Sequence, residues 1–269
     1  MNCLVCVKQV PDTDKVSIDP IRHTLVREGA ASILNPYDGY ALELALRLRE
    51  STGGTVTVLS MGPPQAKDSL EKCLAVGADA AWLISGREFS GADTLATGYT
   101  LARAIQHLSH TLALPFDLIL CGKQAIDGDT AQVGPVLAEF LNLPQITSVR
   151  DILLGEDCIR AIRQTAHSEQ ILGCGLPALI TVSATPWPLR IPTLRGKLAA
   201  RKIPIPVLTN AELKLDPDHC GLKGSPTRVI ATSASQRESR CVFLKDTAAL
   251  AETLSQLGFV KGGTHHDKA

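Results

Sequence analysis

Aromatic residues are scarce in this 269-residue chain, where they make up 4% of the sequence. Proteins that bind single-stranded nucleic acid stack bases on aromatic side chains, so this scarcity argues against that class. A charge excess is also lacking, because 27 Lys and Arg residues balance 27 Asp and Glu residues. The balance argues against a nucleic-acid-binding protein. With 45% hydrophobic residues, it also argues against a disordered chain.

Long apolar runs are lacking too. No stretch approaches the ~20 apolar residues of a membrane span, and the start, Met1-Asn2-Cys3-Leu4, has none of the features of a signal peptide. We therefore expect no membrane span and a cytoplasmic location, or a mitochondrial-matrix protein whose transit peptide is absent.

Eight cysteines are scattered along the chain, and most lie in apolar runs. Cys3 and Cys6 form a CxxC pair, but residues three apart on a strand point to opposite faces and cannot share a metal. The rest of a zinc pattern is missing. We predict buried, reduced thiols and no metal site.

Short apolar runs alternate with amphipathic stretches, and this order predicts a doubly wound, mostly parallel α/β sheet. The predicted strands are 3–7, 55–59, 80–84 and 116–121. The predicted helices are 37–50, one opened by Pro63-Pro64 and ended by Gly77, one from Asp93-Thr94 toward His110, and one from Asp129-Thr130 to about Leu141. Pro135 conflicts with the last helix, which either kinks there or begins nearer Gly134.

The C-terminal part has a different pattern. Residues 157–165, 170–174 and 177–183 are predicted strands, after which repeated prolines break the periodicity. We predict a nucleotide-binding α/β domain over 1–184. For 185–269 we expect a loop-rich arm that packs on another chain, with one weak helix near 247–257. The loop from Pro186 to Pro206 lacks periodicity, and it presents Leu194 as an apolar tip beside Arg195 and Lys197.

Ligands of a doubly wound sheet bind at the carboxyl ends of its strands. Four loops meet that condition, after Val7, Leu59, Ile84 and Cys121, and the richest is 122–133. Gly122 and Gly128 allow close approach of a ligand, and the amides of 129–132 at a helix N-terminus suit a pyrophosphate. The alternative is an ordinary capped turn with no ligand.

Each polar residue in these four loops allows two interpretations. Lys8 meets a phosphate or a flavin ring, or is a surface cation; Asn35 contacts an adenosine or caps the following helix. Asp127 and Asp129 cap a helix or accept hydrogen bonds from ribose hydroxyls. Known motifs for dinucleotide binding, ATP hydrolysis, serine hydrolases and zinc proteases are missing from the sequence. The sequence therefore supports neither ordinary NAD-dehydrogenase binding nor ATP hydrolysis at a P-loop.

At these loops the sequence resembles the beta subunit of electron transfer flavoproteins. The resemblance rests on 6–12, 35–38, 77–79, 122–133, 176–178 and 193–197, and Gly-Lys-Gln-Ala-Ile-Asp-Gly-Asp at 122–129 is its most specific part. It implies a nucleotide-alpha-hydrolase-like fold, a heterodimer with an alpha subunit, and a site for FAD or AMP. The candidate nucleotide-binding residues are Cys6, Lys8, Asn35, Pro36, Tyr37, Asp38, Met61, Thr94, Thr97, Gly122, Lys123, Gln124, Ala125, Ile126, Asp127, Gly128, Asp129, Thr130, Ala131, Gln132 and Val133.

The sequence is most similar to the flavin-bifurcating kind of this family, in 10–13, 91–97 and 128–135. Small residues at Gly91, Ala92 and Ala96 leave room for a bulky ligand. The resemblance implies electron relay from NADH or a dehydrogenase to an acyl-CoA dehydrogenase, with ferredoxin as a second acceptor if electrons are bifurcated. It also implies that Leu194, with Arg195 and Lys197, anchors the dehydrogenase. The alternatives are an AMP-binding electron carrier and an adenine-nucleotide-binding module without redox function.

Overall fold

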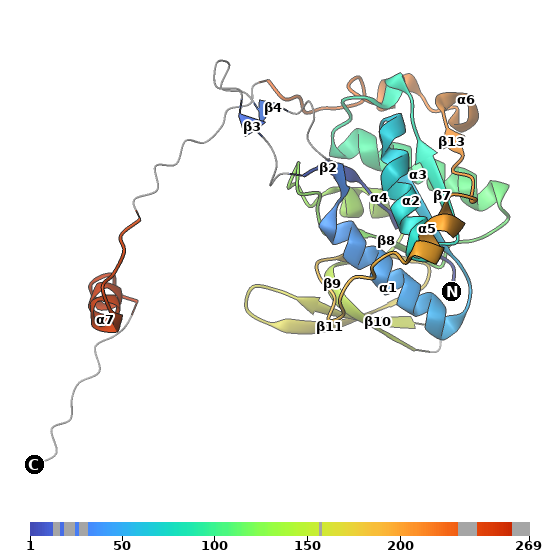
Figure 1. Ribbon diagram of the computed structural model, residues 1–269. Helices are drawn as coiled ribbons and strands as arrows, with labels where there is room; N and C mark the ends of the chain where they lie inside the picture. The colour runs from blue at the N-terminus through green and yellow to red at the C-terminus, as the bar shows by residue number, and fades with distance from the viewer. Residues whose placement is uncertain (13–16, 19–24, 27–31, 156–157, 231–240, 260–269) are drawn as a thin grey trace, which may run out of the picture. The chain divides into compact units, whose positions relative to one another are not determined.

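A computed structural model describes residues 1–12, 17–18, 25–26, 32–155, 158–230 and 241–259 (Figure 1). The chain divides into two compact units, Met1–Thr232 and Ser233–Ala269. The candidate nucleotide-binding residues all lie in the first unit. Thr13 of the 10–13 motif lies outside the described residues.

The first unit is built on one nine-stranded sheet with the order β11-β10-β9-β12-β8-β1-β6-β7-β13. Its central strands pair in parallel, and among the described strands of this sheet only β10, near one edge, runs in the opposite direction, antiparallel to both β9 and β11. The mostly parallel α/β fold is therefore confirmed. The strand bounds are β1 Cys3–Cys6, β6 Val56–Met61, β7 Ala80–Ile84, β8 Leu118–Gly122, β9 Gln145–Leu154, β10 Cys158–Gln164, β11 Glu169–Gly175, β12 Ala178–Val182 and β13 Val207–Leu208.

Helices cover both faces of this sheet. α1 (Pro36–Thr52) and α2 (Lys67–Ala75) share one hydrophobic cluster with Val5 of β1, whereas α3 (Thr94–Thr111) and α4 (Val133–Leu141) share the other with Leu4. Cys3 lies in the first cluster and Cys6 in the second, as alternation along a strand predicts. All eight cysteines are free, and most are buried. Cys158 and Cys241 are exposed, so the prediction of a buried thiol was wrong for those two.

The predicted start of the fourth helix is wrong. Asp129 and Ala131 have φ angles of 53° and 54°, in the left-handed region, so a right-handed helix cannot run through them. α4 begins instead at Val133, which makes Pro135 its third residue. Proline is tolerated there because amides of the first turn have no intrahelical carbonyl to bond. The helix starts nearer Gly134, as one of the two alternatives predicted.

Smaller elements connect the main ones. Two short strand pairs precede α1: β2 (Gln9–Pro11) with β5 (Ser32–Leu34), and β3 (Ser17–Ile18) with β4 (Leu25–Val26). Single turns of 3-10 helix lie at η2 Pro64–Ala66, η3 Arg87–Phe89 and η4 Pro217–His219. The predicted strand starting at 157 is β10, although Asp157 itself lies outside the described residues.

The segment after residue 185 is more regular than predicted. α5 (Leu194–Ala200) occupies part of the predicted loop, because Thr193 caps it with a 3.0 Å hydrogen bond from the Gly196 amide. α5 packs on α2, β13 extends the main sheet beside β7, and α6 (Asn210–Leu213) packs near α3. The first compact unit includes these elements and extends to Thr232.

The second unit contains the predicted C-terminal helix, α7 (Thr247–Gln256). The Asp246 carboxylate caps it by accepting a 2.8 Å hydrogen bond from the Ala249 amide. Leu250, Leu257 and Phe259 are exposed in and beside this helix. Across the described residues of both units, every helix is too short or too polar to cross a membrane.

Candidate functional site

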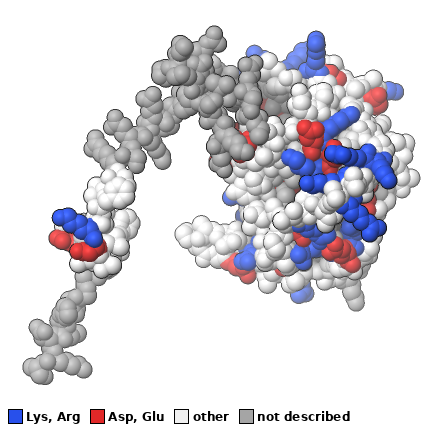
Figure 2. Space-filling model, viewed as in Figure 1, with Lys and Arg blue, Asp and Glu red and all other residues white. Residues whose placement is uncertain are grey.

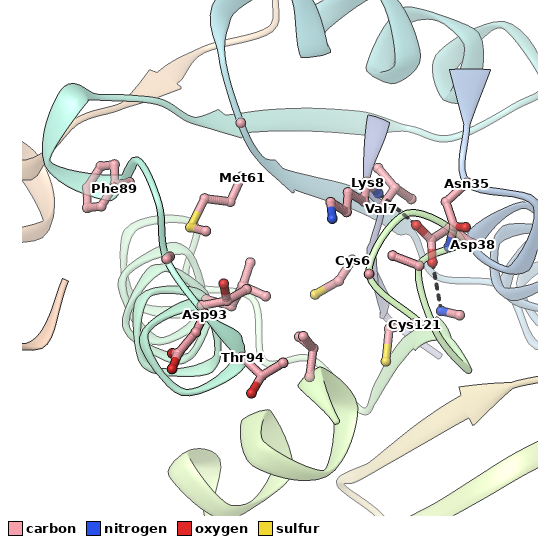
Figure 3. A pocket seen from close by; sticks show the side chains of 18 of the residues that line it. Cys6, Val7, Lys8, Asn35, Asp38, Met61, Phe89, Asp93, Thr94 and Cys121 are labelled. Atoms are coloured by element: carbon pink, nitrogen blue, oxygen red, sulfur yellow. Dashed lines mark hydrogen bonds between the residues drawn. The ribbon is translucent and has the colours of Figure 1, made fainter. Parts of the chain in front are cut away.

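A cavity of about 1170 Å³ opens at the carboxyl ends of β1, β6, β7 and β8. The chain leaves β1 toward β6 and β7 on one side, and β8 lies on the other side, so the strand order reverses at the β1–β8 pair. This is where ligands of doubly wound folds bind. Figure 3 shows Cys6, Lys8 and Cys121 on one side of the cavity and Met61, Phe89 and Thr94 on the other.

The structure brings most of the predicted nucleotide-binding residues to this cavity. Those that line it are Cys6, Lys8, Asn35, Asp38, Met61, Thr94, Thr97, Gly122, Lys123, Gln124, Ala125, Gly128, Thr130, Ala131, Gln132 and Val133. The remaining five, Pro36, Tyr37, Ile126, Asp127 and Asp129, are adjacent in sequence but do not line it.

The loop after β8 is held by the side chain of Asn35, the residue just before α1. Asn35 clamps it: its Nδ2 donates to the Gln124 carbonyl at 2.9 Å, and its Oδ1 accepts from the Ile126 amide at 3.3 Å. The Asn35 side chain makes no capping hydrogen bond to α1, so the alternative in which Asn35 caps this helix was wrong. Gly128 faces open space, because a Cβ there would meet no atom within 4 Å.

The two acidic residues of this loop do not cap the following helix, which was one of the two alternatives. Both Asp127 oxygens lie 2.8 Å from the Lys8 ammonium, and Asp129 accepts a hydrogen bond from Gln124. Because α4 starts later, neither carboxylate caps it. The amides of 129–132 therefore do not form the first turn of a helix. In α4 the first-turn amides without an intrahelical partner are those of Val133 and Gly134.

The start of α3 lies beside the start of α4. Thr94, the first residue of α3, donates from its hydroxyl to Gln132 Oε1 at 3.2 Å. Asp93 caps α3, with 3.0 and 3.1 Å hydrogen bonds from the Leu95 and Ala96 amides. The positive ends of two helices therefore converge on the cavity, which favours an anionic ligand.

Sequence reasoning missed one wall of the cavity. The loop after β7 was among the four expected ligand loops, but only Gly91 and Ala92 in it were expected to lie near the ligand. Ser85, Gly86, Arg87, Phe89, Ser90, Gly91, Ala92 and Asp93 line the cavity, together with Val7, Gly62, Pro63, Pro64, Lys67, Leu83, Leu101, Cys121, Gly134, Val207 and Thr227.

The C-terminal segment 217–227 supports this wall. The Leu222 amide donates to the Ser90 carbonyl at 3.0 Å, and the Asp93 amide donates to the Ser225 hydroxyl at 2.8 Å. Thr227 donates to Asp93 from its amide at 3.0 Å and its hydroxyl at 2.9 Å. Burial raises the pKa of Asp93, but the hydrogen bonds it accepts outweigh burial and hold that pKa below its usual value.

Two thiols lie on the cavity floor. Cys6 and Cys121 are register partners on β1 and β8, and both are buried. Burial, with a smaller effect of the Asp38 charge, raises the pKa of Cys6 to about 12. Burial also raises the pKa of Cys121 well above its usual value. Both stay protonated at neutral pH and present a soft apolar surface. Among the described residues, no cluster of His, Cys, Asp and Glu could hold a metal ion.

Leu194, Arg195 and Lys197 lie outside the cavity, on α5. All three are exposed, and Leu194, the first residue of the helix, is 76% exposed. Figure 2 shows Lys and Arg side chains, with some acidic ones among them, gathered on the face where α2 and α5 lie. The apolar tip in a basic surface exists as predicted, and its role as a docking site stays a prediction.

The fold and the cavity define an α/β protein of the doubly wound class, with a ligand-sized cavity where its strand order reverses. Residues 23–213 match the family model described as electron transfer flavoprotein domain. The chain is 49% identical to an electron transfer flavoprotein beta subunit of Megasphaera elsdenii, over 91% of this chain and 92% of the relative. It is 42% identical to protein FixA of Azorhizobium caulinodans, over 96% and 94%. It is 45% identical to the caffeyl-CoA reductase-Etf complex subunit CarD of Acetobacterium woodii, over 85% and 86%. The chain belongs to the electron transfer flavoprotein family, among its beta subunits, which pair with an alpha subunit.

Proposed function

We propose that the cavity between β1, β8 and the loop after β7 binds FAD, and that the chain relays electrons as one subunit of a heterodimer. The observation that carries this proposal is the size and place of the cavity. Its volume of about 1170 Å³ exceeds the ~300–1,000 Å³ of ordinary small-ligand sites. It therefore offers more room than AMP, the smaller candidate ligand, requires.

The residues present fit such a ligand. The first-turn amides of α4 and the Thr94 hydroxyl suit the pyrophosphate, and Gly128 lets the ligand approach the backbone closely. Cys6, Cys121, Met61 and Phe89 offer apolar surface to a ring system. The flavin supplies the redox chemistry, and the protein contributes binding, orientation and electrostatics.

The electron partners follow from the family. We propose an alpha subunit as the permanent partner and an acyl-CoA dehydrogenase as the acceptor. The name of the Acetobacterium relative places that protein in a complex with caffeyl-CoA reductase, which supports an acceptor that acts on a CoA thioester. Leu194, with Arg195 and Lys197 beside it, is the proposed anchor for this acceptor. We further propose flavin-based electron bifurcation, with NADH as the electron donor and ferredoxin as a second electron acceptor.

A simple carrier with AMP in this cavity is the second candidate, and the convergence of two helix N-termini, which suits any phosphate, supports it equally. An adenine-nucleotide-binding module without redox function is the third. The flavin content of the purified alpha–beta heterodimer separates the three. Two flavins per heterodimer support FAD in this cavity, one flavin with one AMP supports the carrier, and a colourless complex contradicts a redox function.

A further inference from the structure

The Asp38 carboxylate joins the ends of two neighbouring strands. Its Oδ2 accepts a 2.7 Å hydrogen bond from the Lys8 amide, just beyond β1, and its Oδ1 accepts a 3.0 Å hydrogen bond from the Gly122 amide, the last residue of β8. Asp38 comes from the first turn of α1 and is only 5% exposed. Figure 3 shows it between the β1 and β8 ends, on the border of the cavity.

The Lys8 and Gly122 amides point toward each other's strands because the next amide in each strand is hydrogen-bonded to the strand on its other side. The Val7 amide donates to the Leu59 carbonyl on β6 at 2.8 Å, so the next amide, that of Lys8, points the other way, toward β8. Likewise the Lys123 amide donates to the Val182 carbonyl on β12 at 2.7 Å, so the Gly122 amide points toward β1. Where the β1–β8 ladder ends, after the Cys6–Cys121 pair, the carboxylate takes both amides.

The same turn of α1 grips both loops at further points. The Asn35 amide donates to the Lys8 carbonyl at 2.9 Å, and its side chain holds the loop after β8 as described above. The fit around the carboxylate is close: a Cβ at Gly122 would lie 2.4 Å from Asp38 Oδ1 and 2.7 Å from Tyr37 Cβ. A change in the position of Asp38 is therefore transmitted to Gly122 and to the loop that follows.

We propose that Asp38 is a positioning residue of the nucleotide site, which fixes the spacing between the loop after β1 and the loop after β8 and acts on the ligand through them. The inference rests on the proposed function, since it assumes that these loops hold a nucleotide. The family resemblance implies that Asp38 is a nucleotide-binding residue, whereas in this proposal Asp38 acts on the ligand only through the two loops.

The matched pair of variants is Asp38→Asn and Asp117→Asn. Asp117 also accepts a backbone amide, that of Asn2 at 2.7 Å, but at the opposite ends of β1 and β8. In Asp38→Asn one amide faces a donor in place of a charged acceptor. We expect titrations of the Asp38→Asn heterodimer with FAD and with AMP at pH 8 to show an affinity at least about tenfold lower than that of wild type. Asp117→Asn should keep the wild-type affinity. Equal affinity in all three proteins, or an equal loss in both variants, would overturn the proposal.

Hydrogen exchange tests the positioning without any ligand. Peptides that cover 5–12 and 120–130 should exchange faster in Asp38→Asn than in wild type. They should exchange at the wild-type rate in Asp117→Asn, because the hydrogen bond lost there involves the Asn2 amide, which lies outside both peptides. Gly122→Ala disturbs the same carboxylate from the other side and should reproduce both effects. Unchanged exchange in Asp38→Asn would contradict the positioning role. A wild-type protein that binds neither FAD nor AMP would contradict the proposed function instead, and the exchange comparison would still decide the role of Asp38.

Discussion

The Lys8 ammonium lies 2.8 Å from the Asp127 carboxylate and so joins the loop after β1 to the loop after β8 across the cavity edge. Lys8 lines the cavity and Asp127 does not. The pair is part-exposed, with side-chain exposures of 47% and 30%, so we expect it to stabilise the fold by less than about 1 kcal/mol. Its larger effect is on the charge that a phosphate ligand meets.

The two members of this pair should shift nucleotide affinity in opposite directions. Lys8→Met leaves an anion beside the site and should weaken FAD or AMP binding several-fold, whereas Asp127→Asn leaves an unopposed cation and should tighten binding to a similar degree. Both shifts should shrink as salt is raised. Fluorescence titration at low and high ionic strength measures them; shifts of the same sign in both variants would show that the pair acts only through loop structure.

The pH dependence of stability should carry the signature of Asp38. Burial raises its pKa to about 7, although hydrogen bonds from Lys8 and Gly122 act in the opposite direction. The unfolded carboxyl has a pKa of about 3.9, so between about pH 4 and 7 the folded state holds a proton that the unfolded state has lost. Wild type should therefore gain stability relative to Asp38→Asn as pH falls from 8 to 5, by at most about 1.4 kcal/mol per pH unit. Urea unfolding of both proteins across this range measures the difference, and parallel curves would contradict the raised pKa.

The C-terminal unit should be protected by the alpha subunit. α7 has only 10 residues, a length at which an isolated helix is marginal, and apolar side chains in and beside it are exposed. Limited proteolysis of the chain alone should cut within 241–259 sooner than within 194–227, which packs on the sheet domain. Adding the alpha subunit should slow the first cuts. Equal cleavage with and without the partner would argue against a wrapping arm.

The docking prediction concerns Leu194, at the exposed start of α5. Leu194→Ala should weaken docking of the acyl-CoA dehydrogenase by on the order of 1–3 kcal/mol, through lost apolar burial at the interface. Because the side chain is 76% exposed in the chain, the melting temperature and flavin content should not change. Leu153→Ala, at an exposed leucine on β9, is the control and should leave docking intact. A lower melting temperature with unchanged electron transfer would contradict the anchor role.

Local patterns were enough to predict the centre of the sheet. β1, β6, β7 and β8 are buried on both faces, so they appear as short apolar runs, and Asp93 marks the start of α3 as a capping residue. β9 was missed for a physical reason. Ser148 has a φ of 59°, and pairing with β12 and β10 is irregular beside it, so the buried residues are Ile146, Val149 and Ile152, without the alternation of a regular strand.

The second cavity wall could not be predicted from local pattern either. Asp93 and Thr227 are 134 residues apart, and the hydrogen bonds between them depend on the whole fold. Residues of the loop after β8 line the cavity, but the predicted start of the following helix was about a turn too early, because the left-handed residues Asp129 and Ala131 delay α4.

Nucleotide extracted from the heterodimer with Gly128→Val tests the central claim most directly. Gly128 lines the cavity, its φ is compatible with a side chain, and a Cβ there meets open space, so valine should fold normally and project into the ligand's place. Gly175→Val, at the end of β11 away from the cavity, also meets open space and is the matched control. We predict that Gly128→Val loses the nucleotide of this site while Gly175→Val keeps it. A Gly128→Val heterodimer with its full complement of nucleotide would contradict the assignment of the cavity as the nucleotide site.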